Sequence, residues 1–506
     1  MITAALLVCS AVLFYFSFPN VLCVKGAPLC AWGCVLPFLF VLDGRRMRDR
    51  FLLGLVWAML SYGMLVWWLI PVSKGGWAIF VLALSMQGVF FALLFPSAVR
   101  SWTGKLFLIP CAWVASEWGR TLMLGGFSWS LGYSQASLPE VIQVASIGGV
   151  YAVAWVLVFF QTSVYVVART RGQKNRLWLW GVAVVALIVV CGAMRIILAP
   201  RAMVAATKRV ENVMRVATIQ PNISREDKVR EDLYDVHALK HMTMTKKAVM
   251  AGWLGGADLV VWPETAFTDD ILTDMQWRPR LEAAARSMGV NILVGSALLW
   301  DGRDFNSAIL LSSRGDWKSV YHKMRLVPFS EFVPKGAEGV AALFHIGQYH
   351  FSAGVRPGSM VLPGGKAFGV VICSEEFYPE MFQHLAVAKP QFTVIMLNDG
   401  WFARREALYL HALAAPLRAV ESGMPVVRAA NTGLTCAFDA YGRRVGRSPE
   451  VGRADVAVYD MPAVGALCTF YAKYADVFAL MCFVFVIMMR LFIQLHRSKT
   501  ETSHAD

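Results

Sequence analysis

Long apolar segments fill the first part of the chain and return near its end. Crossing a hydrocarbon core of about 30 Å takes about 20 mostly apolar helical residues. Eight segments approach that length, at 4–18, 29–42, 51–70, 77–99, 106–122, 141–168, 177–198 and 475–495. The first lacks a basic start and a convincing cleavage site, so we interpret it as a retained anchor. The pattern predicts a polytopic α-helical membrane domain of about eight transmembrane helices.

Between the seventh and eighth apolar segments, the pattern changes to short strands separated by helices. Strands are expected at 214–223, 257–267, 291–300, 305–315, 317–328, 367–377 and 392–402. Helices are expected at 225–252, 278–289 and 411–421, and paired strands at 424–445. This alternation predicts a layered α/β domain with a mixed sheet. We therefore expect a membrane domain at 1–200 with seven helices, a globular domain at 211–465, and a last helix with a tail at 466–506.

Composition and charge agree with a membrane protein. The chain is 57% hydrophobic and 16% charged, whereas about a quarter of the residues in a soluble protein are charged. Basic residues gather in alternate short loops, at 43–50, 100–105 and 169–176, and in the tail after residue 490. Such loops face the cytoplasm, so the globular domain is expected on the opposite side of the membrane. The net charge of +14 largely reflects these loops. We find no phosphate-binding glycine loop or recognition helix, so no nucleic-acid partner is expected.

Cysteine and histidine spacing gives no indication of a metal. Most of the ten cysteines lie in or beside the apolar segments, and those of the globular domain form no close CxxC pair. His237 and His241 are spaced to share a helix face but have no apparent third ligand. A solvated helix face is the default interpretation of this pair.

Three reactive side chains follow apolar strands of the globular domain. They are Glu264 in VVWPETAF, Lys323 in VYHKMRLVPFSEFVP and Cys373 in GVVICSEEF. Sites in α/β domains are commonly built at such strand ends. Taken singly, each has an ordinary explanation: a surface turn for Glu264, a solvated Lys323, and a small buried hydrophobe for Cys373.

Taken together, the three segments resemble, in order and spacing, the signature segments of the nitrilase superfamily. That superfamily folds as an αββα sandwich and uses Glu, Lys and Cys to attack carbon bonded to nitrogen or oxygen. The segments SEWGRTL (116–122) and GGFSWSLGYSQ (125–135), with spans on both sides of the globular domain, make the whole chain similar to the apolipoprotein N-acyltransferase family. The resemblance implies a bacterial inner-membrane enzyme with its catalytic domain on the periplasmic side. It implies acyl transfer from a phospholipid to the α-amino group of a diacylglyceryl-cysteine, through a thioester on the enzyme.

The roles of the three residues can also be argued from their chemistry. A thiol is mostly protonated at pH 7, so Cys373 needs a base or a cation beside it. Glu264 can accept the proton, and Lys323 can stabilise the oxyanion that forms on the ester carbonyl. Conversion of a thioester to an amide is downhill, so no cofactor is expected.

The resemblance implies further site residues, each with a simpler alternative. Glu331 is expected to support Lys323, the alternative being a cap or a partner for Arg325. Glu375, Asn398 and Trp401 match family positions near the substrate. Glu375 is as easily a loop residue, while Asn398 could close a strand and Trp401 could simply pack.

Two departures from the family bear on substrate contacts. Ser374 stands where the family often has an aromatic residue. The polar segment SREDKVRED (224–232) follows the first strand, where a Trp is usual. We interpret both as affecting substrate choice rather than reaction type.

Other features of the sequence are less specific. Glu117 and Arg120 lie in or at the end of an apolar segment, where they could pair with each other or contact a lipid headgroup. Leu343, Phe344 and Tyr349, in the stretch 341–351, are expected to form a lid dipping into the membrane surface, with core packing the alternative.

Two other functions remain open from the residues alone. The first is a membrane-tethered nitrilase-type amidohydrolase, in which water replaces the amine. The second is a lipid-binding or transport protein whose catalytic domain is inactive. The many spans favour a lipid donor and a lipid-anchored acceptor that reach Cys373 from the bilayer, and the intact set of Glu264, Lys323 and Cys373 argues against an inactive domain.

Overall fold

The computed structural model describes residues 1–99, 101–170, 176–207, 213–254, 259–344, 350–402, 404–462 and 467–502. The chain forms two compact units. The helical unit comprises Met1–Ile70, Trp77–Ile197 and Lys473–Asp506, and the α/β unit comprises Pro71–Gly76 and Leu198–Ala472.

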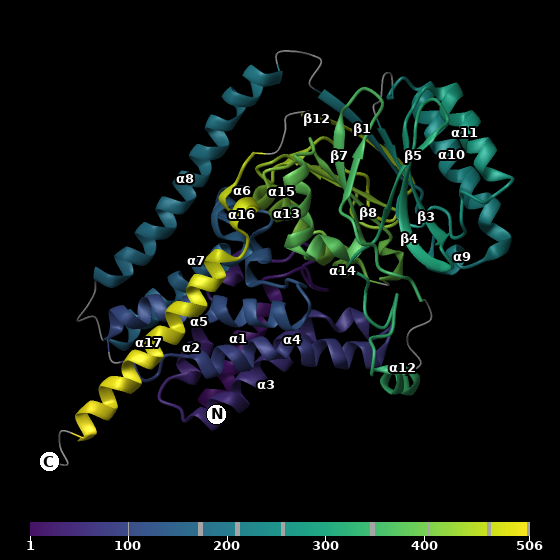
Figure 1. Cartoon of the computed structure of the whole chain (residues 1–506). Helices are drawn as coiled ribbons and strands as arrows, with labels where there is room; N and C mark the ends of the chain where they lie inside the picture. The colour runs from purple at the N-terminus through teal and green to yellow at the C-terminus, as the bar shows by residue number, and fades with distance from the viewer. Residues whose placement is uncertain are drawn as a thin grey trace. The chain divides into compact units, whose positions relative to one another are not determined.

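The helical unit places each predicted apolar segment at least partly on a helix. Its main helices are α1 (Ile2–Phe16), α2 (Leu36–Leu42), α3 (Met47–Leu65), α4 (Lys74–Leu94), α5 (Trp102–Met123), α7 (Ala145–Arg169), α8 (Arg176–Thr207) and α17 (Val477–Thr502). Helix α5 packs against α7 and α17, and α1 packs against α2 and α3 (Figure 1).

The predicted count of about eight transmembrane helices is not confirmed. Among the described residues, four helices are long and apolar enough to cross a bilayer: Lys74–Leu94, Ala145–Arg169, Leu179–Leu198 and Val477–Leu495. The apolar helices Ile2–Phe16 and Pro28–Leu42 are shorter. Helices α3 and α5 have the length, but each contains three charged residues. Apolar composition therefore located the helices, whereas their length and charge limit the number that qualify as spans.

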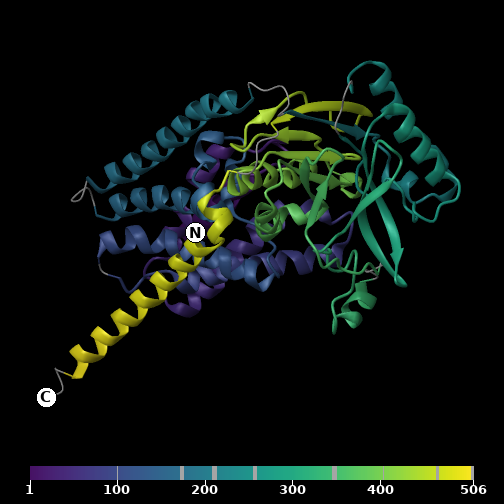
Figure 2. The same cartoon turned by 45° about the horizontal axis from the view of Figure 1, so that its top comes forward.

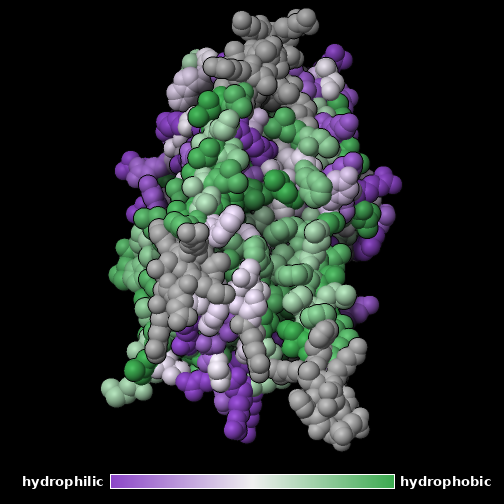
Figure 3. All heavy atoms as spheres, turned by 90° about the vertical axis from the view of Figure 1, so that its left-hand side faces the viewer, coloured by the Kyte–Doolittle hydropathy of each residue, from purple (hydrophilic) through white to green (hydrophobic). Residues whose placement is uncertain are grey.

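Helices α8 and α17 expose apolar side chains, whereas a helix of a soluble protein buries its apolar face. Only 11% of the apolar window of α8 and 17% of that of α17 is buried. Figure 3 shows hydrophobic residues spread over much of the face it draws. The exposed side chains on these two helices include Leu187, Val190, Met194, Ile197, Met481, Val484, Met488 and Leu495. Such surfaces are suited to lipid.

Residues of the predicted basic segments meet at one end of the helical unit. Asp43 forms ion pairs with Lys105 (3.7 Å) and Arg169 (2.8 Å). Arg50 donates a hydrogen bond to the backbone oxygen of Phe95, and Arg490 donates one to the backbone oxygen of Leu93. The loop before α3, the start of α5, the end of α7 and the last helix thus share one end of this unit.

The described residues of the α/β unit form two six-stranded sheets. The first has the order β12-β1-β2-β3-β4-β5, with β1 (Val213–Gln220), β2 (Leu259–Val261), β3 (Ile292–Trp300), β4 (Arg303–Leu311), β5 (Trp317–His322) and β12 (Asp455–Pro462). The second has the order β11-β10-β9-β8-β7-β6, with β6 (Gly358–Val361), β7 (Ala367–Ile372), β8 (Thr393–Leu397), β9 (Val426–Ala430), β10 (Cys436–Phe438) and β11 (Arg444–Val445).

Helices cover the outer faces of both sheets (Figures 1 and 2). Helices α10 (Tyr234–Met250) and α11 (Trp277–Met288) belong to the first sheet, and α13 (Pro379–Ala388) and α15 (Ala414–Ser422) to the second. The predicted αββα sandwich is confirmed, but with two mixed sheets rather than the single one expected from the strand pattern. Within each sheet three neighbouring strands are parallel, β1 to β3 and β7 to β9.

Several predicted elements are shorter than their sequence patterns. The strand expected at 317–328 ends at His322, where the chain leaves the sheet. The helix expected at 225–252 is split into the one-turn α9 (Arg225–Lys228) and the longer α10. The helix expected at 411–421 corresponds to α15 (Ala414–Ser422), and His411 instead ends the preceding helix α14 (Arg405–His411). The end of β5 falls directly before Lys323.

Candidate active site

The proposed reactive groups lie at the carboxyl ends of strands in both sheets. Glu264 follows the parallel strand β2, Cys373 follows the parallel strand β7, and Lys323 follows β5. Carboxyl ends of parallel strands are a common location for sites in α/β folds. Gly295 of β3 lies against the Glu264 turn, since a Cβ atom there would be 2.3 Å from the backbone oxygen of Pro263.

Strained backbone marks the turns that carry these side chains. Cys373 has φ of 54°, Thr265, next to Glu264, has 46°, and Phe329, two residues before Glu331, has 62°. Non-glycine residues with positive φ cost of order 1–3 kcal/mol and cluster at functional sites. The left-handed conformation of Cys373 forms the junction between β7 and the 3-10 turn η6 (Cys373–Phe377).

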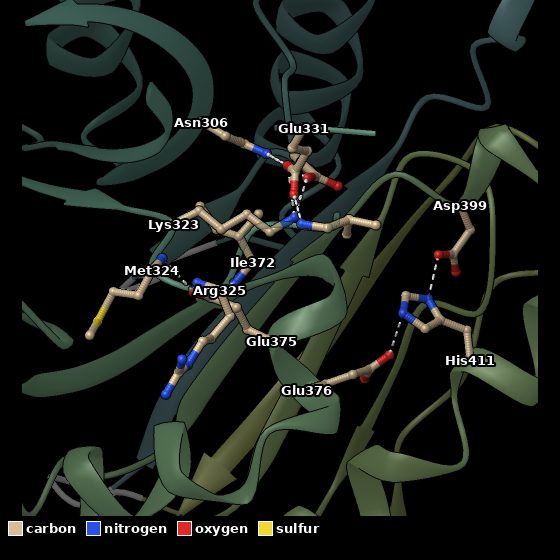
Figure 4. Close-up of polar contacts among 12 residues, drawn as sticks. Asn306, Lys323, Met324, Arg325, Glu331, Ile372, Glu375, Glu376, Asp399 and His411 are labelled. Atoms are coloured by element: carbon tan, nitrogen blue, oxygen red, sulfur yellow. Dashed lines mark hydrogen bonds and ion pairs between the residues drawn. The ribbon is translucent and has the colours of Figure 1, made fainter. Parts of the chain in front are cut away.

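Lys323 lies between two carboxylates in the protein interior. Its Nζ atom is 2.9 Å from Oε1 of Glu331 and 3.7 Å from Oε1 of Glu264. Asn306 of β4 joins the same group, because its Nδ2 donates to Glu264 at 2.7 Å and to Glu331 at 3.1 Å. Figure 4 shows Asn306, Lys323 and Glu331 pointing toward one another. The other oxygen of Glu331 accepts a hydrogen bond from the backbone N–H of Val327. Ion pairs and hydrogen bonds therefore hold these side chains in one polar cluster.

Burial and charge determine the protonation of the lysine and the thiol. Burial alone would lower the pKa of Lys323, but Glu331, Cys373 and Glu264 together raise it above its usual value, so the ammonium form persists. Burial raises the pKa of Cys373 well above its ordinary value; Glu264 raises it further and Lys323 lowers it. The resting thiol is therefore protonated, and its activation requires a base.

Both carboxylate oxygens of Glu375 accept hydrogen bonds from groups of the protein itself. One carboxylate oxygen accepts hydrogen bonds from the backbone N–H groups of Met324 and Arg325, the other from that of Ile372, and the hydroxyl of Tyr321 reaches both. Glu375 is fully buried. It connects the nucleophile turn to the segment that follows β5, and this geometry differs from that of the substrate contact that the resemblance implied.

Asn398 and Trp401 lie at the end of β8. The side-chain oxygen of Asn398 accepts a hydrogen bond from Asn431 at 2.9 Å, and Asn431 also donates to the backbone oxygen of Ile223. Trp401 has the guanidinium of Arg225 over its ring at 5.0 Å. The loops after β1, β8 and β9 are thereby linked.

The polar segment after β1 reaches the site. Lys228 donates a hydrogen bond from Nζ to the backbone oxygen of Glu264 at 3.0 Å. Burial lowers its pKa to about 8. Segment 224–232, noted in the sequence as a departure from the family, thus supplies one cation at Glu264 and another at Trp401.

The structure brings Glu264, Lys323 and Glu331 into one cluster whose charges act on Cys373. The sequence interpretation missed Asn306. Its signal was a polar residue inside the mostly apolar strand FNSAILL, since a buried polar side chain needs a hydrogen-bond partner. Asn431 and Lys228 carried no comparable local signal, because their partners come from distant segments.

The other residues noted in the sequence make their hydrogen bonds and ring contacts outside the Lys323 cluster. His241 is buried against the ring of Trp262 and contacts the backbone oxygen of His237. No three His, Cys, Asp or Glu residues in the described ranges are placed to hold a metal ion. In the helical unit, Glu117 accepts hydrogen bonds from Trp113, Ser130 and the backbone N–H of Leu131. Arg120 donates to the hydroxyl of Tyr62.

Part of the lid predicted at 341–351 lies outside the described residues. Residues 345–349 are not described, and neither are the side chains of Leu343 and Phe344. Helix α12 (Glu338–Phe344) precedes that gap. The lid therefore remains a prediction.

Two family models match the chain in succession. The model described as Apolipoprotein N-acyltransferase N-terminal domain matches residues 10–163, and the model described as Carbon-nitrogen hydrolase matches residues 215–464. Among solved structures, an amidase from Nesterenkonia sp. is 19% identical, covering 53% of this chain and 95% of its own, with a TM-score of 0.36. The two-sheet fold, the buried Glu–Lys pair and the family model define the α/β unit as a carbon-nitrogen hydrolase domain of the nitrilase type.

Curated relatives extend the similarity across both units. An apolipoprotein N-acyltransferase from Geobacter metallireducens is 31% identical over 494 residues, covering 94% of this chain and 92% of the relative. One from Vibrio cholerae is 29% identical, covering 72% of this chain and 70% of the relative. The chain belongs to the apolipoprotein N-acyltransferase family.

Proposed function

We propose that the protein transfers a fatty acyl chain from a phospholipid to the α-amino group of the diacylglyceryl-modified amino-terminal cysteine of an apolipoprotein. Its products are the triacylated lipoprotein and a lysophospholipid. The observation that carries this proposal is the similarity to a named N-acyltransferase over 94% of the chain. The cluster of Glu264, Lys323 and Glu331 beside Cys373 supplies the groups that the reaction needs.

The first half-reaction forms a thioester. Glu264 accepts the proton of Cys373 while the sulfur attacks the ester carbonyl carbon of the phospholipid. Lys323 donates a hydrogen bond to the oxyanion, because its ammonium is fixed by Glu331. The tetrahedral intermediate then breaks its carbon–oxygen ester bond. Glu264 returns the proton to the departing alkoxide, which leaves as the lysophospholipid.

The second half-reaction uses the same groups. The neutral α-amino group attacks the thioester carbonyl carbon, and Lys323 again stabilises the oxyanion. Glu264 accepts a proton from the amine as the carbon–sulfur bond breaks, and it returns this proton to the Cys373 thiolate. The amide is more stable than the thioester, so the chemistry requires no nucleotide or other cofactor.

Other residues are assigned supporting roles. Asn306 holds Glu264 and Glu331 at the two sides of the lysine. Glu375 positions the nucleophile turn through its hydrogen bonds to the β5 segment. Asn398 and Trp401 are proposed to contact the substrate, with Trp401 held under Arg225.

We also propose the topology and domain division expected from the sequence. Residues 1–200 and 466–506 span the inner membrane, and residues 211–465 form the catalytic domain on the periplasmic side. The contacts of Asp43 with Lys105 and Arg169 support one common side for the basic loops. Asp476 at the start of α17 accepts a hydrogen bond from Trp118 near the far end of α5, which supports the opposite side for the attachment of the catalytic domain.

A reconstituted transfer assay tests the function. The purified protein is incubated with phospholipid vesicles and a diacylglyceryl lipopeptide, and the products are separated by mass spectrometry. We expect an N-acylated lipopeptide and an equal amount of lysophospholipid. Release of free fatty acid without amide product would instead support the amidohydrolase-type reaction with water and would overturn the transferase proposal.

A further inference from the structure

Four ionisable side chains that the proposed steps do not use are buried next to the nucleophile turn. They come from four elements: Glu376 from η6, Asp399 from the turn η7 (Asp399–Trp401), His411 from the end of α14, and Arg428 from β9. Glu376, Asp399 and Arg428 have no exposed surface, and His411 is 8% exposed. Glu376 is three residues from Cys373, so the group is coupled directly to the nucleophile turn.

His411 bridges the two carboxylates. Its Nδ1 atom is 2.6 Å from Oδ1 of Asp399, and its Nε2 atom is 3.3 Å from Oε1 of Glu376. Figure 4 shows the imidazole lying between the two acids. Phe377 stacks on one face of the ring, with centroids 5.4 Å apart, and Phe402 meets it edge-on. The ring is therefore held in a single orientation.

Arg428 completes the network through the same two carboxylates. Its guanidinium donates two hydrogen bonds to Glu376, at 3.0 and 2.9 Å, and lies 3.9 Å from Asp399. An ionised carboxylate only accepts hydrogen bonds, so an imidazole facing one at each nitrogen satisfies both only when both nitrogens carry protons. With His411 protonated, two negative and two positive charges balance.

The environment favours that protonated form. Burial lowers the pKa of His411, but Asp399 and Glu376 outweigh it and raise the pKa above its usual value, with Arg428 opposing them. Asp399 also raises the pKa of Cys373. A charge on the imidazole therefore offsets a carboxylate that would otherwise oppose formation of the thiolate.

We propose that His411 is a positioning residue for acyl transfer, whose imidazolium bridges Asp399 and Glu376, fixes the nucleophile turn and neutralises the buried negative charge beside Cys373. The space around Asp399 is consistent with this arrangement. A Cβ atom at Gly433 would lie 2.4 Å from Oδ2 of Asp399, and that oxygen accepts no hydrogen bond from the residues that the structure describes. Asp399 is therefore closely packed, and its negative charge is stabilised by its charged neighbours His411 and Arg428.

The charge of the His411 bridge depends on pH. Because the folded-state pKa of His411 is raised, the bridge is fully charged below the ordinary pKa of histidine, and its charge is lost as the pH rises through the folded value. Above that pH, the group of four carries one uncompensated negative charge. Folding stability and thiolate formation at Cys373 are both expected to weaken there.

The inference rests on the proposed function for its role but is tested without that reaction. Full-length protein in detergent is alkylated with iodoacetamide at a series of pH values, and the rate at the Cys373 peptide is read by mass spectrometry. His411→Gln leaves a net charge of −1 in the network at every pH, so it should differ from the wild type only where His411 is charged. Below the folded pKa of His411, near neutral pH, we expect alkylation to be about tenfold slower, as for a rise of about one unit in the pKa of Cys373, and at higher pH the two profiles should converge. His384→Gln, at an exposed histidine of α13, is the matched control and should superimpose on the wild type.

Charge-balance variants separate this role from a purely structural one. While His411 is protonated, Glu376→Gln alone leaves a net charge of +1, so its alkylation near neutral pH should be faster than that of the wild type. The double variant His411→Gln/Glu376→Gln is neutral again and should return toward the wild-type rate at that pH. An unchanged profile in Glu376→Gln, or a double variant shifted as far as His411→Gln, would overturn the inference. If acyl transfer were absent while these shifts appeared, only the proposed function would fail.

Discussion

At the scale of single residues, the site is most sensitive to substitutions in the ion cluster around Lys323. The ammonium is almost completely buried between Glu331 and Glu264. Buried charges of this kind are tolerated only when they are paired and hydrogen-bonded. Removing one member therefore changes the protonation of the others as well as the chemistry.

Lys323→Met tests the oxyanion role. The variant removes the donor to the developing oxyanion and leaves two buried carboxylates facing each other, so kcat should fall by about 10²-fold or more. Lys318→Met, on the same strand but at an exposed lysine that forms an ion pair with Asp316, should retain wild-type turnover. Both are compared in the lipopeptide assay, and a Lys323→Met enzyme with a tenth of the normal kcat would contradict the assignment.

Asn306→Ala tests the residue that the sequence interpretation missed. It removes both hydrogen bonds that hold Glu264 and Glu331 apart around the lysine, so we expect about a tenfold loss of kcat or more, as for a lost charged hydrogen bond of about 1.5–3 kcal/mol. KM for the lipopeptide should change little. Asn291→Ala, a buried asparagine that bonds the backbone of Ser313 on the same sheet, is the control. Equal losses in the two variants would indicate a stability effect instead.

The sequence could predict the residues whose role is indicated by their neighbours along the chain. Glu264, Lys323 and Cys373 each follow an apolar strand and sit in recognisable segments. Asn306, Lys228 and His411 acquire their partners only through folding, since each binds a side chain or backbone group from a separate element. No spacing rule connects such pairs, which explains why the sequence interpretation named the reacting groups and Glu331 but missed these three residues.

At the scale of elements, hydrophobic alternation located the strands but not their ends. The strand ending at His322 and the helix break after His411 both occur where the chain turns to direct a polar side chain into the interior. Assigning the strands to two sheets rather than one required the order of pairing, and only the family resemblance supplied that. Periodicity reports which face is buried, whereas pairing depends on contacts between distant segments.

Gly295→Ala tests the fit between strand β3 and the Glu264 turn. A methyl group there would meet the backbone oxygen of Pro263 at 2.3 Å and the backbone nitrogen of Thr265 at 2.7 Å, and neither backbone group can move without displacing Glu264. We expect a lower melting temperature and a kcat reduced by at least about tenfold, since small misplacements of catalytic groups are costly. Gly33→Ala, where an added Cβ meets nothing within 4 Å, should behave as the wild type. Normal kinetics in Gly295→Ala would show that β3 does not constrain the site.

At the scale of the whole molecule, apolar segments and basic loops indicated the membrane domain, but the number of spans could not be fixed from them. Short helices and charged helices such as α5 contribute to the same helical unit without meeting the criteria for a span. Composition measures how apolar a helix is, whereas neighbouring helices determine whether its charges face lipid. The buried partners of Glu117 and Arg120 illustrate this.

Reporter fusions test the topology. Alkaline phosphatase fused after residue 210 should be active, and the same reporter after Asp506 should be inactive, because the basic segments are expected in the cytoplasm. Green fluorescent protein at the two positions should give the reverse pattern. Phosphatase activity at the carboxyl terminus would invert the proposed orientation and show that a span has been miscounted.

Direct detection of the acyl-enzyme tests whether Cys373 carries the acyl chain. The purified protein is mixed with phospholipid alone, without any acceptor, and its intact mass is measured before and after treatment with hydroxylamine. We expect a mass increase of one fatty acyl group, sensitive to hydroxylamine, located on the Cys373 peptide and lost in Cys373→Ala. An unmodified wild-type protein under conditions that support turnover, or an equal adduct in Cys373→Ala, would contradict it.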